Sequence, residues 1–301
     1  MRLIAALAIC LFTVLPATAA ERFDDAPRIA VISAFPPELT VLASSTTDQK
    51  RYTAAGVTFT TGELEGKPVV LFLSGVSMVN AAMTTQLALD RFNVTRIVFS
   101  GIAGGVDESL DIGDVIVADQ WSQNLETAFA RETENGFELS ASMRNDNLPA
   151  FGMMIPRSIM IARGDNPPER RRWFPVDPAM LTSARGIATT TPLARCNAAQ
   201  SCLAHTPKVV VGGNGISAPV FLDNAAYRKY ARATFQARVV DMESAAVAHV
   251  AYANGTPFIA FRSLSDLAGG GDEANEMQTF LQLASNNSAS VVKAFVKALP
   301  E

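Results

Sequence analysis

The sequence predicts a single α/β domain with a mainly parallel, mixed central sheet flanked by helices. Short, continuous apolar runs rich in β-branched residues recur along the chain, and longer helical patterns separate them. Continuous rather than alternating apolarity is typical of strands buried on both faces of a sheet, and alternation of strands with helices indicates a mainly parallel sheet. With 301 residues, 49% of them apolar, the chain can bury one full core.

The first twenty residues have the pattern of a secretory signal peptide. Arg2 supplies a positive charge, residues 3–15 are almost wholly apolar, and residues 17–19 (ATA) offer small side chains at a cleavage position. The apolar run is too short for a convincing membrane span. We therefore expect residues 1–20 to be removed and the domain over 21–301 to be periplasmic or secreted, without membrane attachment after cleavage.

Six apolar runs beyond the signal segment are expected to be short buried strands. They are residues 28–34, 68–74, 96–100, 114–118, 208–211 and 257–261. The glycine-rich stretch 101–105 (GIAGG) is expected to halt the third of these strands.

Helical patterns are expected at three places between and after these strands. Residues 77–92 form an amphipathic helix, a second helix covers 241–253, and a last one runs from 276 to about 299. Asp241 suits the N-cap of the second helix and Gly255 suits the position just beyond its end. The apolar face of the first helix would comprise Met78, Ala81, Ala82, Leu87 and Leu89.

The stretch from about 120 to 206 has weak periodicity, polar runs and a proline-rich segment, and it is interpreted as an insertion packed on the same domain. It contains Cys196 and Cys202, which export would place in an oxidising compartment. A short-loop disulfide and a pair of unlinked thiols both remain open. A zinc site is disfavoured, because only His205 lies nearby and a second cysteine pair is missing.

The charge pattern favours a small-molecule partner over nucleic acid. The formal net charge is −4, and the densest basic cluster, 169–173 (ERRRW), lies between prolines and is interpreted as a solvated loop. Residues 213–218 (GNGISA) mimic a dinucleotide fingerprint, but Pro219 directly after them disfavours the helix start that such a site requires. No metal or organic cofactor is expected.

Four polar or glycine-rich signals fall at the expected carboxyl ends of strands, where open α/β sheets bind ligands. They are Glu38, the loop 100–105, Met242-Glu243, and Arg262 with Asp266. Each also has a purely structural explanation. Glu38 and Glu243 could be first-turn helix acids, the glycines could make tight turns, and Asp266 could be an N-cap.

Several of these segments resemble the nucleoside phosphorylase/nucleosidase superfamily, most closely the methylthioadenosine/S-adenosylhomocysteine nucleosidases. The resemblance rests on ISAFPPEL at 32–39, SGIAGG at 100–105, IGDVIVAD at 112–119 and VVDMESAAVAHVAYANGTPFIAFRSLSD at 239–266. It covers most of 28–297 apart from 120–206. It also implies a homo-oligomer, expected to be a dimer.

The resemblance implies a role for each candidate residue. Asp266 matches the acid that protonates the departing purine, Glu38 the carboxylate that activates water, and Arg262 the arginine that holds this water and its base. The substrate-binding positions implied by the resemblance are Met242 and Glu243 beneath the sugar, Gly104 near the base, and Phe221 and Leu222 on the wall of the base pocket.

These roles are chemically coherent for hydrolysis of a purine nucleoside. The N-glycosidic bond breaks through a cationic sugar, and a neutral purine departs more readily than its anion, so one carboxylic acid must reach the base while another carboxylate serves the water. Burial would have to raise the pKa of Asp266.

Two alternatives remain open at this point. Phosphorylases of the superfamily place arginines in the first strand-end loop and before the glycine loop, whereas the corresponding stretches here, SAFPPEL and IVFSGIAGG, contain none. A hydrolase is therefore favoured over a phosphate-dependent phosphorylase. Ile102 stands where the nucleosidases usually carry a serine, which leaves room for a non-catalytic nucleoside-binding or storage protein on the same scaffold.

Overall fold

The structure, a computed structural model, describes residues 22–143, 146–271 and 274–300. The expected signal peptide, residues 1–20, lies outside the described residues. Among the helices of the described ranges, none is both long and apolar enough to cross a membrane.

A mixed sheet of twelve strands forms the centre of the domain, with the main order β14-β7-β16-β17-β5-β1-β4-β3-β2 and with β18 pairing both β5 and β6. The pairs β1·β4, β1·β5, β5·β18, β6·β15, β7·β16 and β16·β17 are parallel. The strands are β1 Asp24–Ser33, β2 Thr47–Ala54, β3 Val57–Leu64, β4 Lys67–Leu73, β5 Phe92–Gly105, β6 Val115–Val117, β7 Gln120–Gln123, β14 Phe174–Pro175, β15 Val209–Val211, β16 Asn214–Ser217, β17 Ala237–Asp241 and β18 Phe258–Asp266.

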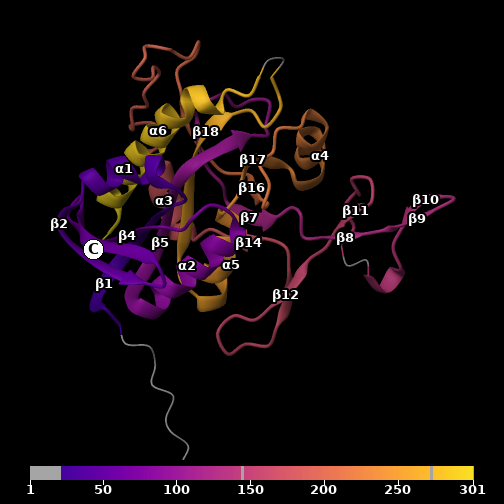
Figure 1. Ribbon diagram of the computed structural model, residues 1–301, viewed down its shortest axis with the longest axis horizontal. Coiled ribbons are helices and arrows are strands. Elements are labelled where there is room, and N and C mark those ends of the chain that lie inside the picture. The colour runs from indigo at the N-terminus through magenta and orange to yellow at the C-terminus, as the bar shows by residue number, and fades with distance from the viewer. Residues whose placement is uncertain (1–21, 144–145, 272–273, 301) are drawn as a thin grey trace, which may run out of the picture.

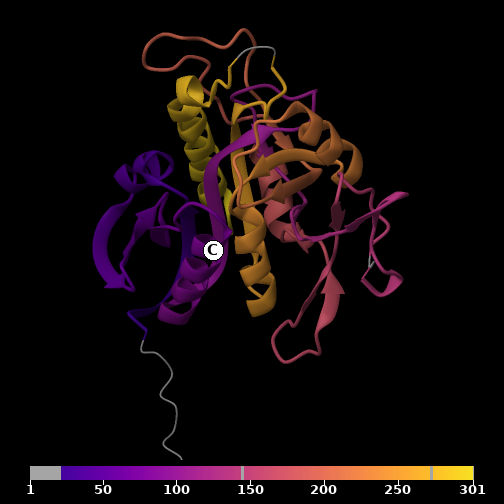
Figure 2. The same ribbon diagram turned by 45° about the vertical axis from the view of Figure 1, so that its right-hand side comes forward.

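Helices cover both faces of this sheet (Figures 1 and 2). α1 and α3 contact α6, whereas α2 contacts α5. The helices are α1 Pro36–Ser44, α2 Met78–Arg91, α3 Pro178–Ile187, α4 Ala225–Phe235, α5 Ser244–Asn254 and α6 Met277–Ala298, with a 3₁₀ turn, η1, at Ala141–Met143. The predicted single α/β domain with a mixed, helix-flanked sheet is confirmed.

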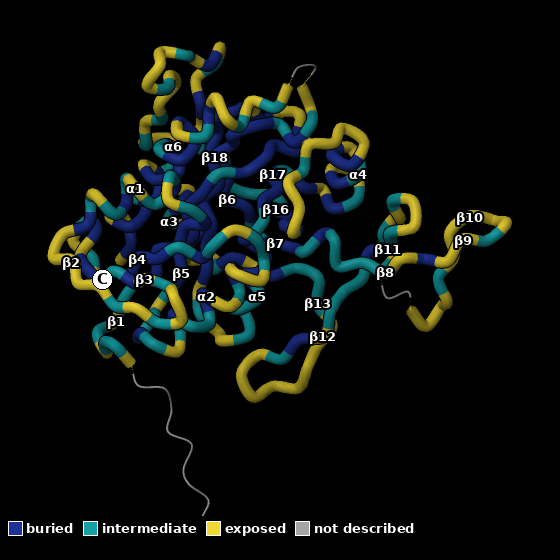
Figure 3. Tube along the Cα trace, in the orientation of Figure 1, coloured by how far each residue is buried: buried dark blue, intermediate teal, exposed yellow. Residues whose placement is uncertain are grey.

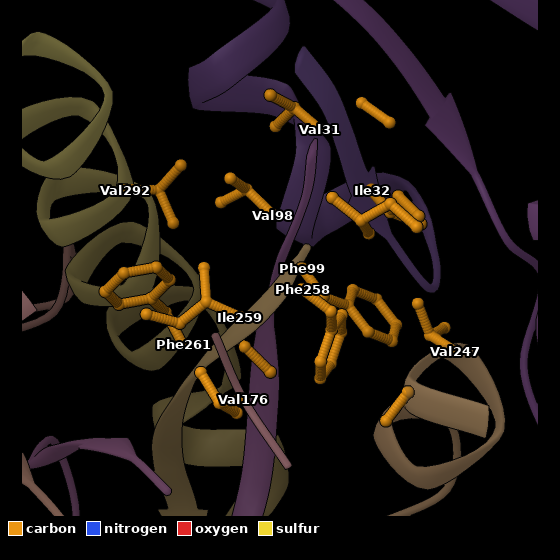
Figure 4. Close-up of a cluster of buried hydrophobic side chains, with 14 of the residues drawn as sticks. Val31, Ile32, Val98, Phe99, Val176, Val247, Phe258, Ile259, Phe261 and Val292 are labelled. Carbon is orange, nitrogen blue, oxygen red and sulfur yellow. The ribbon is translucent and has the colours of Figure 1, made fainter. Parts of the chain in front are cut away.

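The core lies where β5 and β18 run side by side in the middle of the sheet (Figure 4). Phe99 and Ile259 are fully buried on these strands, with Val292 of α6 on one side and Val247 of α5 on the other. Both strands are therefore apolar on both faces, which explains their continuous apolar sequences. This arrangement makes the carboxyl ends of β5 and β18 a rigid platform.

Two expected boundaries near this platform are wrong. β5 does not halt at residue 101 but continues through the glycines to Gly105, because β18 pairs with it along one edge and β17 with its far end. The helix expected from residue 241 begins at Ser244, and Asp241 is the last residue of β17. The expected end is confirmed, since Gly255 follows α5 with a φ of 67°.

The buried face of α2 also differs from the expected one. Its fully buried residues are Ala81, Thr84, Thr85 and Ala88. Met78, Ala82, Leu87 and Leu89 are only partly buried against the core. The threonines are buried on this face, and the Thr84 hydroxyl donates to the Ser74 carbonyl at 3.1 Å.

The stretch 120–206 does not fold as one unit. β7 and β14 belong to the central sheet, and α3 packs against α6. Three small hairpin-like pairs lie outside that sheet, and Figure 3 shows much of their surface exposed. They are β8 Thr127–Phe129 with β11 Met154–Pro156, β9 Arg131–Thr133 with β10 Gly136–Glu138, and β12 Ile159–Ile161 with β13 Glu169–Arg171.

The structure tests two expectations within this stretch, the loop at 169–173 and the state of the cysteine pair. Residues 169–171, expected in a solvated loop, form strand β13 of a small hairpin, and Arg172 makes a partly buried ion pair with Asp146. Cys196 and Cys202 form a disulfide, which settles the choice between a bridge and free thiols.

Candidate active site

A cavity of about 360 Å³ opens where β1, β5, β17 and β18 end. Its wall combines buried acids with apolar side chains. The lining residues are Ala34, Phe35, Glu38, Val76, Ile102, Ala103, Gly104, Val220, Phe221, Leu222, Val240, Asp241, Met242, Glu243, Ser265, Asp266, Met277, Gln278 and Leu281. Seven of the eight predicted site residues lie on this wall, and Arg262 lies behind it.

Glu38 enters the cavity from the first turn of α1, which starts at Pro36 directly after β1. Its Oε2 accepts the N–H of Ala34 at 2.7 Å, and its Oε1 accepts the N–H of Ile102 at 2.7 Å. Burial raises the pKa of Glu38, and the Arg262 guanidinium and the backbone donors oppose that rise only in part. The carboxylate is thus fixed in place and is a better proton acceptor than an exposed glutamate.

Arg262 projects from the middle of β18 and has no exposed surface. Its Nε lies 2.7 Å from Asp241 Oδ2, its Nη1 3.7 Å from Glu38 Oε1 and its Nη2 3.4 Å from Glu243 Oε2. Its guanidinium also stacks over the ring of Phe99, 4.0 Å from the ring centre. Arg262 therefore acts on the cavity through the carboxylates that it holds.

Asp241 is a site residue that sequence reasoning assigned only to helix capping. Its Oδ1 accepts the hydroxyl of Ser217 and the N–H groups of Glu243 and Ser244, while its Oδ2 faces Arg262. The Asp241 carboxylate thus accepts hydrogen bonds from backbone N–H groups at the start of α5 and also orients the Arg262 guanidinium. Its place directly before Met242-Glu243 was the available signal.

Met242 and Glu243 link β17 to α5 and form one side of the cavity. Glu243 Oε1 accepts the N–H of Ser77 at 2.8 Å, so this carboxylate also fastens the segment before α2. Burial raises the pKa of Glu243 to about 7, with the nearby Asp241 charge adding to the rise and Arg262 opposing it. The Glu243 carboxyl group therefore titrates close to neutral pH.

Asp266 ends β18 on a different part of the cavity wall and is only 2% exposed. Its Oδ1 accepts the N–H of Ala268 at 2.8 Å, and its Oδ2 accepts the hydroxyl of Ser265 at 3.0 Å. Burial raises its pKa, and within the described ranges no cation forms an ion pair with it. This environment favours the protonated acid. The expectation that burial raises this pKa is met.

Gly104 lies directly against the acid. A Cβ at this position would stand 3.1 Å from Asp266 Oδ1 and 3.1 Å from the Cβ of Ala268. A side chain here would crowd the carboxyl group, so glycine keeps the space beside Asp266 open.

Phe221 and Leu222 contribute to the apolar edge of the cavity. Phe221 is 52% exposed, and its neighbours Val220 and Val76 are also exposed. These residues therefore lie at the rim rather than deep in the pocket.

The described part of the chain offers no cluster of three or more histidine, cysteine, aspartate or glutamate side chains that could hold a metal ion. The site consists of carboxyl groups, one buried arginine and backbone donors.

The fold and the cavity define a member of the phosphorylase superfamily, to which the chain belongs, because residues 28–297 match the family model of that description. A 5′-methylthioadenosine/S-adenosylhomocysteine nucleosidase from Bacillus licheniformis is 31% identical, over 90% of this chain and 99% of the relative. One from a Marinomonas species is 30% identical, over 89% and 98%. The predicted nucleosidase family, and with it the class of N-glycosyl hydrolases, is confirmed.

Solved structures agree with this placement. The adenine complex of the Colwellia psychrerythraea nucleosidase superposes with a TM-score of 0.69 at 27% identity, covering 90% of this chain and 95% of that one. The Neisseria meningitidis enzyme in complex with methylthio-immucillin-A superposes with a TM-score of 0.68 at 25% identity, covering 90% and 99%.

Proposed function

We propose that the protein hydrolyses the N-glycosidic bond of 5′-methylthioadenosine, S-adenosylhomocysteine or a closely related purine nucleoside and releases adenine. The observation that carries this proposal is the division of carboxyl groups within one cavity. Asp266 is buried and forms no ion pair with any described residue, whereas Glu38 and Glu243 share Arg262. Such a site offers a proton donor and a negatively charged region to the same ligand.

Asp266 is the general acid in this mechanism. Burial raises its pKa and so favours its protonated form, which transfers a proton to a ring nitrogen of the purine as the glycosidic bond breaks. Protonation makes the base a neutral leaving group, so the positive charge that develops stays on the sugar. Gly104 and Asp266 both line the cavity, and the absence of a side chain at Gly104 lets the flat base approach the acid.

Glu38 is the general base that orients and deprotonates the attacking water. Three backbone N–H groups, those of Ala34, Phe35 and Ile102, and the Arg262 guanidinium fix its carboxylate, so the position of the water is fixed as well. Arg262 is a positioning residue in this scheme. The carboxylates around Arg262 also stabilise the cationic sugar by their negative charge.

Met242 and Glu243 are proposed to hold the sugar, with the Glu243 carboxylate accepting hydrogen bonds from ribose hydroxyls. Phe221 and Leu222 are proposed to cover the base from the rim. Their exposed position is compatible with a wall completed by the bound ligand.

The charge distribution supports water rather than phosphate as the nucleophile. The described lining of the cavity includes four acidic residues and no lysine or arginine, and Arg262 faces Asp241, Glu38 and Glu243. A phosphate dianion would meet repulsion from these acids.

Ile102 is the one feature that favours the alternative of a binding protein without activity. Its side chain lines the cavity, but its N–H still donates to Glu38 Oε1 at 2.7 Å. The backbone contact that fixes the Glu38 carboxylate does not depend on the side chain at position 102. We therefore favour an active enzyme.

The test is to incubate the mature protein with a panel of purine nucleosides, with and without phosphate, and to measure free base by chromatography. Release that is independent of phosphate supports hydrolysis. Strict dependence on phosphate identifies a phosphorylase, and binding without release in both conditions identifies a binding protein.

We also propose that the protein is exported to the periplasm or secreted after loss of residues 1–20, and that it is a homodimer. Large apolar side chains are exposed at the cavity rim, at Val76, Val220 and Phe221, and on α2, at Val79 and Met83, as expected for a surface covered by a second copy. N-terminal sequencing of the protein from cell fractions tests export. Light scattering of the mature protein tests the dimer.

A further inference from the structure

The segment 189–207, between α3 and β15, contains the Cys196–Cys202 disulfide, and we name it the disulfide loop. It lies beside the N-terminal end of α6 in both ribbon views (Figures 1 and 2). The bridge closes a tight turn in which Asn197 Oδ1 accepts the N–H groups of Ala199 and Ser201. Both cysteines are exposed, so a reductant in solution can reach the bridge.

The disulfide loop holds the beginning of α6 by contacts on its outer side. Asn197 Nδ2 donates to the carbonyl of Thr279 at 3.1 Å. Leu203 is buried in a small apolar cluster with Phe280 and Leu283 of α6 and with Ile112. One turn further along the helix, Asn287 both donates to and accepts from the backbone of Ala194.

The opposite side of the same two turns forms the cavity wall through Met277, Gln278 and Leu281. Leu267, which directly follows the acid Asp266, packs against the Leu203 cluster. At the helix start Asn275 accepts the N–H of Met277, whereas Glu276 at the N-cap position makes no side-chain cap. The contacts that Asn197 and Leu203 make with the side of the helix are therefore important for the position of these turns.

We propose that the oxidised disulfide loop positions the first two turns of α6, so that this wall of the cavity takes its substrate-binding shape only while Cys196 and Cys202 are bridged. Asn197 and Leu203 are the positioning residues. The covalent closure restricts the turn that presents both of them, which limits the alternative conformations open to the loop. The proposal rests on the proposed nucleosidase function only for its kinetic readout.

Reduction by a dithiol such as dithiothreitol is the first experiment. The dithiol supplies two electrons and two protons, the S–S bond becomes two thiols, and the reagent becomes its own disulfide. We expect amide hydrogen exchange at 277–283 to quicken, and KM to rise about fivefold with kcat unchanged. A fivefold change corresponds to about 1 kcal/mol, the net contribution of roughly one hydrogen bond. Reoxidation should restore both values.

Three variants separate the contributions. Cys196→Ser/Cys202→Ser should behave like the reduced protein and should not respond to dithiothreitol. Asn197→Asp keeps the acceptor that shapes the turn and the disulfide, but loses the donor to Thr279, so it should raise exchange and KM without reduction. Ser201→Ala is the matched control, because its hydroxyl has no hydrogen-bond partner in the described part of the chain, and it should match the wild type.

Unchanged exchange at 277–283 in both the reduced protein and Asn197→Asp overturns the proposal. If the double cysteine variant fails to fold, these two measurements still decide. A protein that releases no base in any form, but whose exchange at 277–283 responds to reduction, refutes the proposed function and leaves the positioning role intact.

Discussion

Arg262 Nη1 lies 3.7 Å from Glu38 Oε1, and both side chains are almost wholly excluded from solvent. The two residues come from opposite ends of the domain in sequence, Glu38 from the first turn of α1 and Arg262 from β18. Because Asp241 and Glu243 share the same guanidinium, a single positive charge offsets three carboxylates. Removal of that charge therefore affects both stability and chemistry.

We expect Arg262→Met to destabilise the protein by about 3–5 kcal/mol near neutral pH, because it leaves buried carboxylates without their cation. The loss should be smaller near pH 5, where protonation of these acids relieves the repulsion. Urea unfolding at both pH values measures it. Equal destabilisation at the two pH values would show that the charge of Arg262 is not the cause.

Asp266→Asn should reduce base release by about 10²–10⁴-fold, because an amide cannot transfer the proton that the purine needs. Asn can still accept the N–H of Ala268 through its oxygen, so the fold should be kept. Free adenine measured by chromatography gives the rate, and circular dichroism with thermal unfolding provides the control. Turnover equal to that of the wild type would remove Asp266 from the role of acid.

The position of Asp266, Glu38 and Glu243 in one cavity was predictable, because strand ends that share one edge of a sheet bring their following residues together. The role of Asp241 was not. An aspartate three residues before a helix looks like a cap in sequence, and only the distant β18 supplies the arginine that it holds. The length of β5 was missed for a similar reason, since its glycines read as a break until β17 and β18 pair with them.

The face of α2 shows a different limit of sequence patterns. Thr84 and Thr85 count as polar in a hydropathy pattern, yet both are buried in the structure. The Thr84 hydroxyl finds a tertiary partner in the Ser74 carbonyl, which a helical period does not reveal. The residues expected on that face, such as Leu87 and Leu89, are only partly buried.

Glu243 should make the stability of the protein depend on pH. Its pKa in the folded protein is about 7, against an ordinary value of 4.5, so between these values the folded state binds more protons than the unfolded state. The free energy of unfolding therefore falls as pH rises through this window, by on the order of 2 kcal/mol from this residue. Glu243→Gln should flatten the fall, while Glu63→Gln, exposed on β3, should leave it unchanged.

Urea unfolding of the three proteins at pH 5 and pH 8 measures this dependence. Glu38 and Asp266 also have raised pKa values and act in the same direction, so the test is the difference between the wild type and Glu243→Gln. If the two proteins lose stability in parallel, Glu243 does not titrate in this window.

Gly101→Ala should disrupt the pairing of Glu38 with Arg262 directly. A Cβ at this position would collide with Arg262 Nη1 and stand 2.5 Å from Glu38 Oε1. Because the two side chains are buried and fixed by several partners, they cannot move aside without breaking other contacts. We expect a destabilisation of about 1–3 kcal/mol, typical of overpacking, together with a loss of base release.

Gly186→Ala is the matched control for this substitution. Gly186 is exposed on α3, and a Cβ there meets nothing within 4 Å. Alanine should stabilise the helix by up to about 1 kcal/mol and leave activity unchanged. Thermal unfolding and base release measured on both variants make the comparison. A Gly101→Ala protein as stable and active as Gly186→Ala would mean that the end of β5 at 100–105 can shift without cost, and that Arg262 does not need its present distance from Glu38.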